Sequence, residues 1–263
     1  MTNPILMIGA GLVIGFLIGL TGMGGGALMT PFLLTVMKFD PILAVGTDLA
    51  FAAITKIIGG LGHHHESKIS LKPVLWMAVG SIPASILGSQ FILSQTDNRQ
   101  LIDEFLPNLL GWTLVLVSII IIARTFRFFG PKKEREVRYP SPWALVGIGA
   151  IGGVLVGMTS IGGGTVIMAL LLLFFAIPLN YMVGLDVMHG ALLAIISAFS
   201  YIFAGQTDWS SVGLLLIGSL PGVWLGAKAV HRLNLLLVRG VLGLLVLGNL
   251  KIGLPRRKHS KLF

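Results

Sequence analysis

The chain has 263 residues, of which 55% are hydrophobic and only 11% are charged, and its formal net charge is +9. A soluble domain carries about 25% charged residues, so this composition excludes an ordinary soluble protein. Uncharged runs at 74–93 and 105–123 are long enough to cross a hydrocarbon core of about 30 Å as helices. They lack the alternating polarity of a membrane β-strand. The sequence therefore predicts an all-α polytopic membrane protein with membrane lipids as its surroundings.

The apolar segments, in chain order, place five in each half of the chain. In the first half we expect them at 4–21, 26–37, 41–62, 72–94 and 105–126, and in the second at 142–158, 164–177, 180–204, 210–230 and 233–253. The second and seventh are too short to span, since residues 27–37 would rise only about 16 Å as a helix. The chain should therefore break or turn inside the membrane beside each short helix, which gives about 8–10 membrane segments.

The positive charges lie mainly in short connections between these segments, which fits positive-inside topology better than nucleic-acid binding. The main cluster, "ARTFRFFGPKKEREVRYPSP" at 123–142, predicts a basic cytoplasmic linker at 127–141. Cysteine is absent, which excludes disulfides and thiolate metal sites. The stretch "GHHHESK" at 62–68 has adjacent histidines that do not share a helix face, so we interpret it as a solvated loop. No metal, cofactor or nucleic-acid partner is expected.

A repeat with one constant offset, that from Gly19 to Gly157, relates the two halves. "GLTGMGGGALMTP" at 19–31 recurs as "GMTSIGGGTVIMA" at 157–169, and "AVGTDLA" at 44–50 recurs as "MVGLDVM" at 182–188. The same offset pairs "GSIP" at 80–83 with "GSLP" at 218–221. This register predicts a duplication, with repeats at 1–126 and 142–263. Five segments per half favour inverted repeats, as does the opposite charge of some equivalent loops; the basic tail at 251–263 keeps parallel repeats as the alternative.

The two glycine motifs predict a substrate site. Non-helical backbone at membrane depth must be buried in protein or line a polar cavity, and each short helix would point the positive end of its dipole at the break. Glycines let an anion approach backbone N–H groups, and hydroxyls add donors. The alternative is close helix packing through small residues. The candidate ligands are Thr21, Gly22, Gly24, Gly25 and Gly26 in the first motif, and Thr159, Ser160, Gly162, Gly163 and Gly164 in the second.

The motifs "GLTGMGGGALMTP" and "GMTSIGGGTVIMA", followed by "AVGTDLA", "VGLDVMHG", "GSIPASILGS" and "GSLPGVWLGA", occur in an order that resembles the sulfite exporter TauE/SafE family of anion permeases. The resemblance covers nearly the whole chain. It implies a multi-pass protein of a bacterial-type plasma membrane. It also implies transport, usually outward, of small sulfur-containing anions such as sulfite, sulfoacetate or related sulfonates.

Ionisable residues within the segments are the next candidates, because a charge at the bilayer centre costs at least about 2.5–3.5 kcal/mol. Asp48 and Asp186 occupy equivalent positions of the repeat and either bond to backbone freed by the neighbouring break or couple protons and organise the substrate site. Lys56 either partners an aspartate or extends toward Gly62. His189 is either a packing residue or a proton carrier.

These observations predict a secondary transporter of a small oxyanion, with protons as the candidate coupling ion. An anion channel, a permease for a non-sulfur anion and a membrane scaffold stay as alternatives, and a homodimer is left open. No nucleophilic triad, P-loop or dinucleotide motif occurs in the sequence, so an enzyme is not expected.

Overall fold

A computed structural model describes residues 3–21, 26–63, 71–128, 140–161, 164–175 and 179–229. This part of the chain is helical and contains no strand, which confirms the all-α prediction. Most of the predicted linker, the stretch at 64–70 and the tenth predicted segment at 233–253 lie outside it.

The described helices correspond to the first nine predicted segments. They are α1 (Pro4–Thr21), α2 (Gly26–Thr35), α3 (Pro41–His63), α4 (Leu71–Ser94), α5 (Arg99–Phe128), α6 (Pro142–Thr159), α7 (Val166–Phe174), α8 (Leu179–Phe203) and α9 (Trp209–Ala229). The largest difference from the prediction is at α5, which begins six residues early because the Asn98 side chain accepts a hydrogen bond from the Leu101 N–H (3.3 Å) and so caps a polar first turn.

Six of the described helices, α3, α4, α5, α6, α8 and α9, are long and apolar enough to cross a membrane. By contrast, α2 has 10 residues and α7 has 9, so each covers about half of a hydrocarbon core. The structure thus confirms a polytopic protein with a short helix after each glycine motif.

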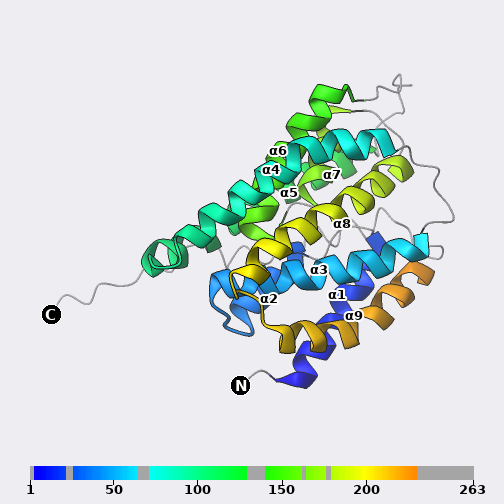
Figure 1. The fold of residues 1–263 in the computed structure, drawn as a ribbon. Helices are drawn as coiled ribbons and strands as arrows, with labels where there is room; N and C mark the ends of the chain where they lie inside the picture. Colours follow the sequence, from blue (N-terminus) through cyan, green and yellow to red (C-terminus); the bar gives the residue numbers. More distant parts are fainter. Residues whose placement is uncertain are drawn as a thin grey trace.

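The helices pack around a central pair, α3 and α8, which contact each other along their lengths (Figure 1). On one side α8 packs against α4, which is paired with α6; on the other, α3 packs against α9, which is paired with α1. Each flanking pair therefore combines a helix from the first half of the chain with one from the second.

Glycines bring the helices of each flanking pair into close contact. Gly11, Gly15 and Gly19 of α1 face the backbone of α9, and Gly149, Gly153 and Gly157 of α6 face the backbone of α4, so a Cβ atom at any of these six positions would overlap the partner helix. Such contacts are the typical use of small residues in membrane helices. The contacts of the two pairs join positions that the predicted repeat makes equivalent: Gly11–Leu215 and Gly149–Met77, Gly15–Ser219 and Gly153–Ser81, Gly19–Val223 and Gly157–Ser85. The inversion of the two halves stays a prediction.

Candidate functional site

The start of α2 lies against the end of α6, so the two glycine motifs meet there. A Cβ atom at Gly26 would lie 2.5 Å from the carbonyl oxygen of Ser160, so only glycine fits at this contact. Ser160 ends α6 in the left-handed region, with φ of 62°, and its N–H donates to the Val156 carbonyl (2.8 Å). Ser160, the residue that follows α6, therefore touches the first residue of α2.

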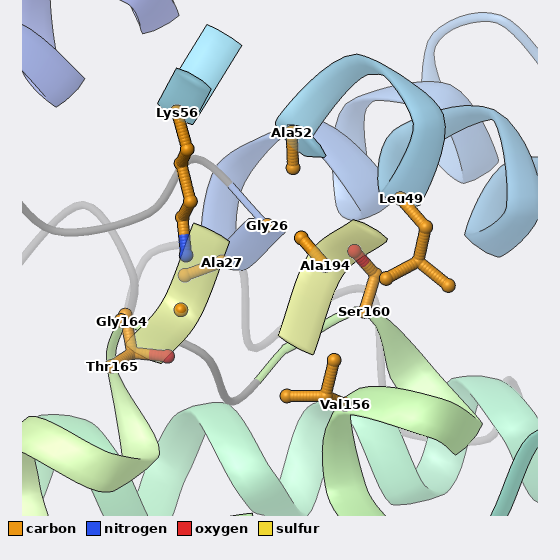
Figure 2. A pocket seen from close by; sticks show the side chains of 11 residues that line it. Gly26, Ala27, Leu49, Ala52, Lys56, Val156, Ser160, Gly164, Thr165 and Ala194 are labelled. Atoms are coloured by element: carbon orange, nitrogen blue, oxygen red, sulfur yellow. The ribbon is translucent and has the colours of Figure 1, made fainter. Parts of the chain in front are cut away.

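A small cavity lies at this contact, lined by residues of α2, α3, α6 and α8 and of the segment before α7 (Figure 2). Its volume is about 10 Å³, room for about one water molecule. An oxyanion is larger, so the cavity has to widen to admit one. Much of its wall consists of pairs of positions that the predicted repeat makes equivalent: Gly26 and Gly164, Ala27 and Thr165, Ala52 and Gly190, Lys56 and Ala194.

Lys56 supplies a positive charge to this cavity. Figure 2 shows its side chain running from α3 into the cavity. Its counterpart in the second half, Ala194, carries no charge. The charged side chain at the cavity therefore comes from the first half of the chain, although the predicted repeat pairs many of the lining positions.

The starts of both short helices also border the cavity. Gly26 and Ala27 are the first residues of α2, and Thr165 is the N-cap of α7. The first N–H groups of a helix have no partner within the helix, and its N-terminus carries about half a positive charge. Two helix N-termini and an ammonium group at one cavity make a site suited to an anion.

Asp48 lies on the same face of α3 as Lys56 because the two are separated by two i, i+4 steps. Its carboxylate is fully buried, and its Oδ2 accepts a hydrogen bond from the Thr30 hydroxyl of α2. Asp48 also interacts electrostatically with Lys56. The Ser160 hydroxyl lies near this carboxylate, but neither it nor Asp48 Oδ1 has a hydrogen-bond partner among the described residues.

Asp186 of α8 is fully buried, and neither of its carboxylate oxygens accepts a hydrogen bond in the described part of the chain. Its electrostatic partner is Lys56 of α3. One turn further along α8, Nε2 of the buried His189 shares a hydrogen bond of 2.7 Å with the Ser81 hydroxyl of α4. The structure thus brings together all four predicted ionisable residues, and it joins the two aspartates through one lysine.

A known protein family matches the sequence of this chain. The family described as sulfite exporter TauE/SafE matches residues 7–252 of the chain. The chain belongs to the TauE/SafE family. The match covers both glycine motifs and every helix named above, apart from the first residues of α1.

Relatives of this TauE/SafE protein carry names of the same kind. The probable membrane transporter protein YjnA of Bacillus subtilis is 36% identical over 85% of this chain and 89% of its own length. The probable membrane transporter protein YdhB of the same organism is 28% identical over 89% and 96% of the two chains. The probable membrane transporter protein MJ0441 of Methanocaldococcus jannaschii is 27% identical over 93% and 95%. No solved structure matches significantly. The protein is thus a membrane transporter of the TauE/SafE family.

The predicted ligands of the TauE/SafE protein fall into three groups: those that line the cavity, one that holds the end of α6, and those outside the described residues. Gly26, Ser160 and Gly164 line the cavity. The hydroxyl of Thr159 instead donates to the Leu155 carbonyl (2.7 Å) and accepts from the Ile161 N–H (3.2 Å), which holds the end of α6 in place. The remaining residues, Gly22, Gly24, Gly25, Gly162 and Gly163 and the Thr21 side chain, lie outside the described residues; their role stays a prediction.

Three polar residues of the site were not predicted: Thr165 at the cavity, Thr30 at Asp48 and Ser81 at His189. Thr165 could have been predicted from the sequence, because a threonine directly before an apolar run is a typical helix N-cap. Thr30 and Ser81 could not, since their partners lie in other helices.

Replacing Ser160 by glycine should separate backbone strain from anion binding. A non-glycine residue in the left-handed region costs about 1–2 kcal/mol, so we expect Ser160→Gly to unfold at a higher temperature or denaturant concentration than the wild type. If the hydroxyl contacts the anion, affinity should fall by about tenfold, the equivalent of about 1.4 kcal/mol. Thermal unfolding with and without anion measures both effects. A variant that is more stable and binds with unchanged affinity would remove Ser160 from the list of ligands.

Proposed function

We propose that this protein is a secondary transporter that binds one small sulfur-containing oxyanion, such as sulfite or an organosulfonate, and exports it by alternating access across a bacterial-type plasma membrane. One observation carries the proposal: the Lys56 ammonium and the N-termini of α2 and α7 border the same cavity. Each of these groups favours a negative charge. The family name adds sulfite as the chemical class.

Binding would begin when the cavity opens and an oxyanion displaces the water for which it has room. One oxygen would face Lys56, while the others would reach the N–H groups at Gly26 and Ala27 and the hydroxyls of Ser160 and Thr165. Glycine at positions 26 and 164 allows this close approach to backbone. The small volume of the cavity, about 10 Å³, supports a carrier that changes conformation to bind its anion over an open anion channel, which needs a continuous path.

Stabilisation of the purified protein by anions tests this proposal. A ligand that binds the folded state raises its stability by about 2.7 kcal/mol at a concentration of 100 times its Kd. We expect sulfite, thiosulfate or a sulfonate such as sulfoacetate or methanesulfonate to raise the unfolding temperature, and uncharged dimethyl sulfone to leave it unchanged. Equal shifts with the sulfone, or no shift with any anion, would contradict an anion site.

Transport itself is measured in liposomes loaded with the anion that stabilises best. A carrier should give saturable export with increasing internal concentration and no single-channel conductance. Conductance without saturation would favour the channel.

A further inference from the structure

The two buried aspartates differ in how their charges are compensated. Asp48 accepts a hydrogen bond from the Thr30 hydroxyl, and a hydrogen bond to a carboxylate stabilises its charged form. Asp186 accepts no hydrogen bond from the described residues and is fully buried. Its compensation therefore comes from Lys56, which is also the cation that lines the anion cavity.

Asp186 and the cavity share one face of α8. Asp186, Gly190 and Ala194 follow each other at i, i+4 spacing, and the last two line the cavity. An anion in the cavity and the Asp186 carboxylate would thus compete for the same ammonium group.

We propose that Asp186 is the proton-binding site of the transport cycle, and that it takes up one proton when an anion takes its place beside Lys56. This inference rests on the proposed anion transport. When the anion pairs with the Lys56 ammonium, Asp186 loses its compensating cation. An unpaired carboxylate in the membrane interior is strongly disfavoured. The carboxylate therefore binds a proton from the aqueous side to which the site is open. It releases this proton when the anion leaves and Lys56 returns to it.

The charges of the Lys56, Asp48 and Asp186 cluster predict how many protons move with each anion. The empty cluster holds one ammonium and two carboxylates, whereas the loaded cluster holds one ammonium, the Asp48 carboxylate, a monovalent anion and a neutral Asp186. Both states carry the same net charge, so one proton moves with each monovalent anion in the same direction. Transport is then electroneutral, and its direction is set by the sum of the anion gradient and the proton gradient across the membrane.

The other ionisable groups near Asp186 are less suited to this role. Asp48 keeps its Thr30 donor, and a proton on His189 would add a second cation beside Lys56, with which His189 interacts electrostatically. The remaining helices packed against α8 contribute no further ionisable group to the cluster: α6 and α7 have none, and the one in α4, Lys72, is exposed.

The test is the pH dependence of anion affinity in the purified full-length protein. The probes are methanesulfonate, sulfate and thiosulfate, whose own charges do not change between about pH 5 and pH 9. Because binding takes up a proton, wild-type affinity should rise as the pH falls, by up to about tenfold per pH unit. Asp186→Asn mimics the protonated state, so its affinity should be independent of pH and match the wild-type affinity at low pH. His189→Gln, the matched control, should keep the wild-type slope.

A direct measurement supports the variants and needs no mutation. In weakly buffered solution with a pH-sensitive dye, the wild type should take up about one proton per methanesulfonate bound. A slope that persists in Asp186→Asn, a slope lost in His189→Gln, or anion binding without proton uptake would overturn the proposal while leaving the anion site intact. Failure of all three probes and of sulfite to bind the wild type at any pH would instead overturn the proposed function and this inference with it.

Discussion

Replacing Lys56 by methionine should strongly weaken anion binding. Methionine keeps most of the length of the side chain but removes the ammonium group that lines the cavity. Removing one partner of a buried charge pair costs about 3–5 kcal/mol, and each 1.4 kcal/mol is about tenfold in affinity. We therefore expect Lys56→Met to bind at least about 100-fold more weakly. Anion-dependent thermal stabilisation and export from liposomes measure the loss.

Two controls separate this effect from a general loss of charge or fold. Lys72→Met removes an exposed lysine at the start of α4 and should leave affinity unchanged. Lys56→Met also deprives Asp186 of its cation, so the single variant should be less stable than the wild type. The double variant Lys56→Met with Asp186→Asn should regain stability but not binding. Retention of anion binding in the double variant would remove Lys56 from the site.

Lys56 illustrates which features of the site could be predicted from the sequence and which could not. Its presence inside an apolar segment marked it as a candidate, because charges are rare in such segments. The spacing of Asp48 and Lys56 along α3 placed them on one face. Sequence alone left open whether Lys56 extends toward the helix end or into the interior, because that depends on the space next to α3. Two small residues of α8, Gly190 and Ala194, line this space together with Lys56.

The nine described helices followed from hydropathy, and the short helices from the length of their apolar runs. The pairing of the helices did not, because each flanking pair joins distant parts of the chain and is fixed by contacts between backbones. The hydroxyls of Thr30 and Ser81 could not be predicted as functional candidates for the same reason. Their partners, Asp48 and His189, become their neighbours only through helix packing.

The structure places the glycines of the motifs in two kinds of surroundings. Gly26 and Gly164 line the cavity, whereas Gly19 and Gly157 face the backbones of α9 and α4. Close packing therefore applies to Gly19 and Gly157, whereas Gly26 and Gly164 stay candidates for the substrate site. A glycine in a helix that faces a neighbouring backbone and one that faces lipid are indistinguishable in sequence, but they should respond oppositely to the same substitution.

Gly153→Ala and Gly147→Ala, both in α6, should change stability in opposite directions. A Cβ atom at Gly153 would lie 2.7 Å from the Cα of Ser81, so the two helices must move apart. Overpacking of this kind costs about 1–3 kcal/mol. At Gly147 nothing lies within 4 Å of the added Cβ, and alanine in place of glycine stabilises a helix by about 0.5–1 kcal/mol. Unfolding of the purified protein by heat or by a denaturing detergent gives both signs.

The same pair of substitutions can be repeated on α1. Gly15 and Gly9 are the repeat equivalents of Gly153 and Gly147; a Cβ at Gly15 would lie 2.6 Å from the Cα of Ser219, and one at Gly9 has open space. If the two crossings are equivalent products of a duplication, Gly15→Ala should destabilise and Gly9→Ala should stabilise by similar amounts. Equal effects of the two substitutions within either helix would contradict close backbone packing. A difference confined to α6 would mean that the duplicated sequence no longer supports both crossings equally. Because Ser81 also holds His189, destabilisation at Gly153 should in addition disturb the buried polar cluster, an effect that Gly15 cannot reproduce through Ser219.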